Sequence, residues 1–128
     1  MKLTMRLMLV SILVIFAAPA FSETASHLYK CEQDEDASDA QVLAAASQWL
    51  HAARGVKGGK NLEVKIHFPI AAMVGETDFL MVVTTPSLSE WGEFMDHYEG
   101  GSMAEADKKF EHIADCPDSA LWESIEIK

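Results

Sequence analysis

Histidines, carboxylates, tryptophans and tyrosines are the side chains of this 128-residue sequence that we consider first as groups that could bind a ligand or transfer a proton. The sequence contains no GxSxG motif and no DxDxDG loop, so neither a serine nucleophile elbow nor a calcium loop is predicted. No two histidines stand four residues apart, which leaves no helical pair for a metal ion. We therefore expect no metal and no cofactor. The five histidines are His27, His51, His67, His97 and His112.

Aromatic residues recur at helical spacing in two segments, around Trp49 and from Trp91 to Tyr98. Side chains spaced in this way more often build a core than a pocket. The alternative is an apolar pocket in which the Tyr98 hydroxyl orients a ligand. His67 falls on the polar side of an alternating segment, so it lies at the surface unless a partner covers that side. The candidate pocket residues are Trp49, His67, Trp91, Phe94, His97 and Tyr98.

The first 22 residues have the pattern of a secretory signal peptide. Lys2 and Arg6 precede an apolar run from Leu7 to Ala18. This run is shorter than the roughly 20 residues of a membrane-spanning helix, so a retained anchor fits less well. Cleavage after Ser22, or after Ala20, would release a mature domain of residues 23–128. We expect that domain in the periplasm or outside the cell, with no membrane attachment.

The mature domain is strongly acidic. The full chain has a net charge of −10, and residues 1–22 contain two basic and no acidic residues, so cleavage changes it to −12. A surface of this charge disfavours nucleic acid and anionic lipid as partners. Solubility is one explanation for the charge, and a cationic partner or ligand is the other.

Cys31 and Cys116 are the two cysteines of the sequence. In an oxidising compartment paired cysteines usually form a disulfide. A metal site made from two distant cysteines and a catalytic thiol both fit the sequence less well. We therefore predict a Cys31–Cys116 disulfide.

The elements that must position these side chains alternate between strands and helices. Strands are predicted at 28–31, 62–68, 79–83 and 121–127. Helices are predicted to begin behind the capping boxes Ser38/Gln41, Ser87/Glu90 and Ser102/Glu105, and to end before Gly55, Gly100 and Cys116-Pro117. The strand at 79–83 is apolar on both sides, which suits a central strand or one that a partner covers.

This order predicts an α+β fold, a ferredoxin-like split βαβ sandwich with a four-stranded antiparallel sheet and helices on one face. In such a sheet the first strand lies beside the last and runs opposite to it. The end of the first strand then meets the start of the last. That placement agrees with the predicted Cys31–Cys116 disulfide.

The strand 62–68, the segment Asp78–Val83 and the helix Leu88–Phe94 give the sequence a resemblance to the dimeric α/β-barrel superfamily. The resemblance spans residues 27–128, and the superfamily includes antibiotic-biosynthesis monooxygenases and stress-responsive barrel proteins. It implies a homodimer that pairs through the open sheet face, and a pocket between sheet and helices. Some barrel families degrade haem, which would make His97 a haem or metal ligand; a solvent-facing position at a helix end is the alternative.

Two functions fit these observations. The first is a non-catalytic module that binds a small apolar or aromatic molecule, or another protein. The alternative is a cofactor-independent, monooxygenase-like enzyme that acts on an aromatic small molecule, and it rests on the resemblance. A buried polar group with a shifted pKa inside an apolar pocket is the feature that would distinguish the two.

Overall fold

The computed structural model describes residues 23–71 and 77–127, so the predicted signal peptide lies outside the described residues. No helix within these ranges is long and apolar enough to cross a membrane. The elements are β1 (Glu23–Gln33), α1 (Asp39–Arg54), β2 (Glu63–His67), β3 (Phe79–Thr85), α2 (Leu88–Asp96), α3 (Gly101–Glu111) and β4 (Ala114–Ile125). This order confirms the predicted ferredoxin-like α+β architecture.

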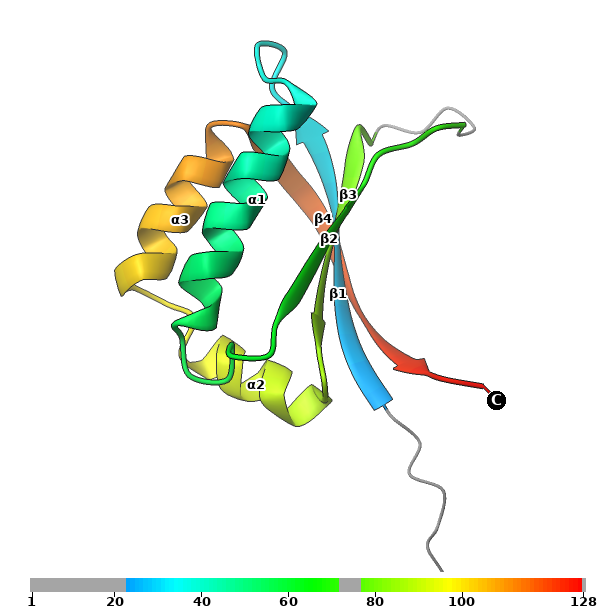
Figure 1. The fold of residues 1–128 in the computed structure, drawn as a ribbon, viewed down its shortest axis with the longest axis vertical. Coiled ribbons are helices and arrows are strands. Elements are labelled where there is room, and N and C mark those ends of the chain that lie inside the picture. Colours follow the sequence, from blue (N-terminus) through cyan, green and yellow to red (C-terminus); the bar gives the residue numbers. More distant parts are fainter. Residues whose placement is uncertain (1–22, 72–76, 128) are drawn as a thin grey trace, which may run out of the picture.

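The four strands form one antiparallel sheet in the order β2-β3-β1-β4. β1 therefore lies inside the sheet, with β3 on one side and β4 on the other. Figure 1 shows α1 and α3 side by side over one face of the sheet, with α2 near one end and the opposite face open. The predicted neighbourhood of the first and last strands is confirmed.

The core lies between the sheet and the helices because the strands alternate their side chains. On β3 the side chains of Phe79, Met81 and Val83 are buried, whereas Leu80 and Val82 between them are half-buried on the open face. Successive residues of a strand point to opposite faces, so one strand supplies both sets. The prediction that β3 is apolar on both sides is confirmed.

Two of the three predicted helix starts are confirmed. Ser38 and Gln41 form a reciprocal capping box at α1, and the Ser87 side chain accepts a hydrogen bond from the Glu90 backbone at α2. The predicted Ser102 cap is wrong, because α3 already begins at Gly101 and its N-cap is Gly100. Gly100 and Gly101 have φ values of 90° and 56°. Glycine adopts such angles without steric strain, so the chain can turn into the helix earlier than Ser102.

The predicted start of the last strand is also wrong, since β4 begins at Ala114 and contains Cys116-Pro117. The pairing explains how a proline fits there. Lys30 pairs with Asp118 and Glu32 with Asp115, so Cys116 and Pro117 together oppose the single residue Cys31. This is a β-bulge on an edge strand, a position that does not need the missing proline N–H.

The predicted disulfide is confirmed at this bulge. The sulfur atoms of Cys31 and Cys116 are 2.02 Å apart, and Cys31 is completely buried. The bond joins β1 to β4, and its two cysteines are 85 positions apart in the sequence. Because it restricts the unfolded chain over this length, the chain-entropy description assigns it about 4–5 kcal/mol of stability.

Replacing both cysteines with alanine should therefore lower the free energy of unfolding by about 4–5 kcal/mol. Urea unfolding followed by circular dichroism measures this difference. Dithiothreitol should destabilise the natural chain by a similar amount and leave the double variant unaffected. A double variant as stable as the natural chain would show that the disulfide does not support the fold.

Candidate functional site

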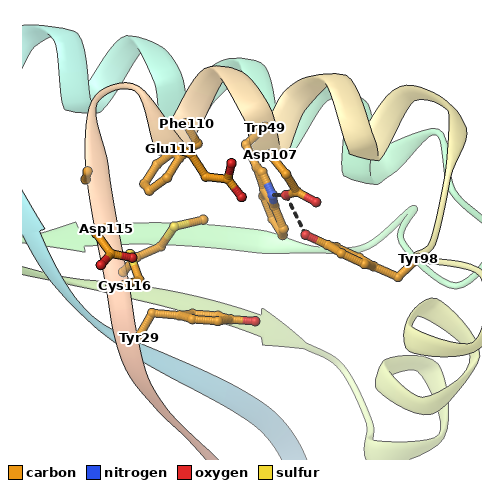
Figure 2. A pocket seen from close by; sticks show the side chains of 10 residues that line it. Tyr29, Trp49, Tyr98, Asp107, Phe110, Glu111, Asp115 and Cys116 are labelled. Carbon is orange, nitrogen blue, oxygen red and sulfur yellow. Dashed lines mark hydrogen bonds between the residues drawn. The ribbon is translucent and has the colours of Figure 1, made fainter.

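A pocket of about 300 Å³ lies between the sheet and α3 (Figure 2). Its walls come from β1, α1, β3, α3, β4 and the segment that joins α2 to α3. Buried apolar side chains form the floor, and three carboxylates stand around it. The lining residues are Tyr29, Trp49, Met81, Tyr98, Asp107, Phe110, Glu111, Ala114, Asp115 and Cys116.

Asp107 is the polar centre of this pocket. Its Oδ1 atom accepts a hydrogen bond from Trp49 Nε1 at 2.9 Å and another from the Tyr98 hydroxyl at 2.5 Å. Phe94 supports both donors from the core, with edge-on ring contacts to Trp49 at 6.3 Å and to Tyr98 at 5.4 Å between centroids. The half-buried carboxylate is thus held in one position by two aromatic side chains (Figure 2).

The two phenols of the pocket keep their protons at neutral pH. Burial raises the pKa of Tyr29 to about 12, and the negative charge of Asp107 acts in the same direction. Burial also raises the pKa of Tyr98, as do its hydrogen bond to Asp107 and the charge of that carboxylate. Shifts away from neutrality make both hydroxyls hydrogen-bond donors and poor proton-transfer groups.

Tyr29 is the first of three hydrogen-bonded polar side chains that extend from the pocket along the sheet. The Tyr29 hydroxyl lies 2.9 Å from Nδ1 of His27, and Nε2 of the same ring lies 3.1 Å from Oγ of Ser119. The rings of His27 and Trp91 make an edge contact at 5.9 Å between centroids. Burial lowers the pKa of His27, so its imidazole is neutral at pH 7. A serine, a histidine and a third polar group in this order have the outline of a nucleophilic triad.

The direction of the hydrogen bonds argues against a nucleophilic serine. The Tyr29 hydroxyl is hydrogen-bonded to His27 Nδ1, and we assign the proton of this bond to the phenol because its pKa is raised. A neutral imidazole that accepts at Nδ1 carries its proton on Nε2. Nε2 then donates to Ser119 and cannot remove the proton of its hydroxyl. The chain Tyr29–His27–Ser119 therefore joins β1 to β4 as a structural contact.

The structure brings some of the sequence-derived candidates together and separates others. Trp49 and Tyr98 line the pocket, and Phe94 packs behind them. Trp91 is half-buried on α2 beside His27 and is not part of the lining.

The two candidate histidines lie elsewhere. His67 is exposed on the open face of the sheet, where it pairs with Leu80. His97 is exposed at the end of α2, and its Nδ1 donates to the backbone oxygen of Glu93 at 2.8 Å. Within residues 23–71 and 77–127 no three histidine, cysteine or carboxylate side chains are grouped as metal ligands.

Most of the carboxylates and apolar residues of the pocket were missed from the sequence. Asp107 had a usable signal, because the buried face of α3 contains Met103, Ala106 and Phe110, and position 107 belongs to the same stripe. An acidic residue in an apolar helical stripe indicates a polar site against the core. Asp115 lay in a segment that was not recognised as part of a strand, so its position beside the pocket had no sequence signal.

Comparisons with known proteins show the fold and not the function. No family model matches the sequence, and no curated protein is significantly similar to it. A dimeric ferredoxin-like protein of unknown function from Thermobifida fusca has a similar structure, with a TM-score of 0.51, 16% identity, and coverage of 82% of this chain and 92% of that one.

Two enzymes have the same architecture. Hydroxynitrile lyase from Passiflora edulis matches with a TM-score of 0.50, 13% identity, and coverage of 84% of this chain and 95% of the enzyme. SnoaB, a cofactor-independent oxygenase from Streptomyces nogalater, matches with a TM-score of 0.51, 3% identity, and coverage of 82% and 94%. Identities this low establish the ferredoxin-like fold alone, which the sequence resemblance predicts.

The lowered pKa of His27 generates a prediction about stability. The unfolded chain binds a proton at His27 more readily than the folded chain. The part of the folding free energy that depends on a neutral His27 is therefore fully present above the ordinary histidine pKa of 6.5, and it is lost as the pH falls below that value. Urea unfolding at pH 7.5 and pH 5.5 should show this loss. His27→Gln should reduce the difference between the two pH values. The matched control His67→Gln changes an exposed side chain and should keep the difference. An unchanged difference in His27→Gln would contradict the assignment.

Proposed function

We propose that this chain is an exported, homodimeric domain whose pocket binds a small molecule without chemically changing it. The observation that carries the proposal is the Asp107 carboxylate, held by Trp49 and Tyr98 at the wall of a pocket that combines aromatic and polar side chains. Ligand sites typically combine an apolar lining with a few fixed polar groups of this kind. The volume of about 300 Å³ suits a compact ligand.

The alternative function, a cofactor-independent oxygenase acting on an aromatic molecule, is favoured by the fold shared with SnoaB and by the aromatic walls. Such an enzyme needs a group that removes a proton from its substrate near neutral pH. The shifted groups of this pocket are Tyr29 and Tyr98, and both pKa values are raised away from neutrality. The raised pKa values of both phenols therefore support binding more strongly than catalysis.

Export is supported by two independent features. The order of basic, apolar and small residues in positions 1–22 is that of a cleaved signal peptide, although this segment lies outside the described residues. The Cys31–Cys116 disulfide fits an oxidising compartment such as the periplasm or the extracellular space. Together they favour a mature domain that begins near Glu23.

Dimerisation is supported by the open face of the sheet. Leu28, Leu80 and Val82 are half-buried there, and Trp122 beside them is 59% exposed. The pairing of Leu28 with Val82 and of Ser26 with Trp122 places these side chains on the same face. Apolar side chains that gather on an uncovered sheet face often mark an interface, and a second copy is the simplest self-complementary partner. The Thermobifida fusca protein with this fold is described as dimeric.

The pocket hypothesis predicts a local response to a small neutral aromatic compound. In ¹H–¹⁵N spectra, 2-phenylethanol should shift the indole signal of Trp49, whose N–H donates to Asp107 inside the pocket. The signal of Trp122 on the opposite face should stay in place. Trp49→Phe and Trp122→Phe assign the two signals. Native mass spectrometry of the exported protein should also detect a bound small molecule, and failure of both measurements would contradict the proposal.

The dimer hypothesis predicts that a charge on the open face separates the subunits. Light scattering should give twice the chain mass for the natural protein and the single mass for Trp122→Asp. Trp122 is exposed in the single chain, so this change should leave the fold intact. Leu43→Asp is the matched control, because Leu43 is 51% exposed on α1 and should not affect association. A natural protein that is monomeric at high concentration and moderate salt would exclude this dimer.

A further inference from the structure

We infer that the ligand of the pocket is an organic cation, a protonated or alkylated amine attached to a small aromatic or aliphatic body. This inference rests on the proposed binding function and specifies the chemical class of the ligand. The open-sided pocket with its aromatic walls defines the site, and the negative charges on those walls determine the charge of the ligand.

The charge of the lining is entirely negative. Asp107, Glu111 and Asp115 are its charged residues, and the lining contains no lysine, arginine or histidine. Figure 2 shows Asp107 and Glu111 projecting from α3 toward the space that Asp115 faces from β4. Among the described residues, Lys57 and Glu93 form a salt bridge, and none of the three pocket carboxylates takes part in one. A cation in the pocket would therefore meet uncompensated negative charge.

The hydrogen bonds of Asp107 leave its charge available. Trp49 and Tyr98 are neutral donors, and both donate to the same oxygen, Oδ1. The second oxygen, Oδ2, accepts no hydrogen bond from the described residues. An asparagine side chain could accept the same two hydrogen bonds without the cost of placing a charge near the core. The hydrogen bonds from Trp49 and Tyr98 do not require a charged acceptor. The carboxylate therefore adds a negative charge in a fixed position, which is available to a ligand.

The aromatic walls suit the same ligand. Tyr29, Trp49, Phe110 and Tyr98 surround the space beside the carboxylates, and the faces of such rings attract ammonium groups. Their apolar surfaces can at the same time cover the body of the ligand. A metal ion fits this lining less well, since within the described ranges no three suitable side chains are grouped as its ligands.

The test compares three probes of similar size and different charge at pH 7: 2-phenylethylamine, 2-phenylethanol and 3-phenylpropanoate. Each is titrated into the full mature protein, and the dissociation constant is read from the Trp49 indole signal. The cation should bind at least about tenfold more tightly than the alcohol, since a hydrogen bond to a charged group contributes a factor of that order. The anion should bind most weakly, and added salt should weaken the cation alone.

Two matched variants locate the effect. Asp107→Asn keeps both hydrogen bonds and should weaken the cation by about tenfold while leaving the alcohol unchanged. Glu105→Gln removes the same charge from an exposed position on α3 outside the pocket and should leave every probe unchanged.

The possible failures are distinguishable. Equal binding of the cation and the alcohol would overturn the inference and leave the proposed pocket function standing. Equal weakening of the cation by Asp107→Asn and Glu105→Gln would also overturn it, because the general surface charge would then be responsible. If none of the three probes moves the Trp49 signal, the inference fails, and the proposed function fails with it if native mass spectrometry also detects no bound small molecule.

Discussion

The antiparallel pairing of β1 with β4 is the contact on which the rest of the domain depends. It joins the two ends of the described chain and places Cys31 against Cys116. It also sets Ala114 and Asp115 beside the pocket and aligns Ser119 with His27. Without β4 the pocket would lose one wall, and the open face would lose Trp122. The bulge at Cys116-Pro117 is the local adjustment that lets this pairing continue along nearly the full length of both strands.

The pocket and the open face are two sides of the same strands. Tyr29 and Met81 line the pocket, whereas their neighbours Leu28 and Val82 belong to the open face. Strand alternation therefore gives each surface its own set of residues, although both share one backbone. The proposed ligand binding and the proposed association should therefore respond separately to substitutions one position apart. The three helices cover only the pocket side, so the apolar residues of the other side stay uncovered in the single chain (Figure 1).

Much of this architecture was readable from the sequence, because alternation and capping are local signals. The strand around Val64, the capping box at Ser38 and the disulfide all follow from nearby residues or from the compartment. The sequence-based predictions were wrong where tertiary contacts override the local sequence signal. Proline at 117 reads as a breaker until the opposite strand shows a bulge, and Ser102 reads as a cap until the two glycines before it start the helix. Asp107 accepts hydrogen bonds from Trp49, which is 58 positions away in the sequence, and from Tyr98, which is 9 positions away. No local spacing in the sequence could therefore predict this site.

The interior place of β1 also determines when the sheet can form. Its partners β3 and β4 come from the middle and the very end of the sequence, so the contacts of the first strand are among the most distant in the chain. Such a topology has a high contact order. Conformational entropy is lost in closing the long loops before the pairing of the strands can stabilise the sheet. During synthesis from the N-terminus, one backbone edge of β1 would stay unpaired until residues 114–125 are available. The sheet and the disulfide at its bulge are thus completed only once residues 114–125 can pair with β1.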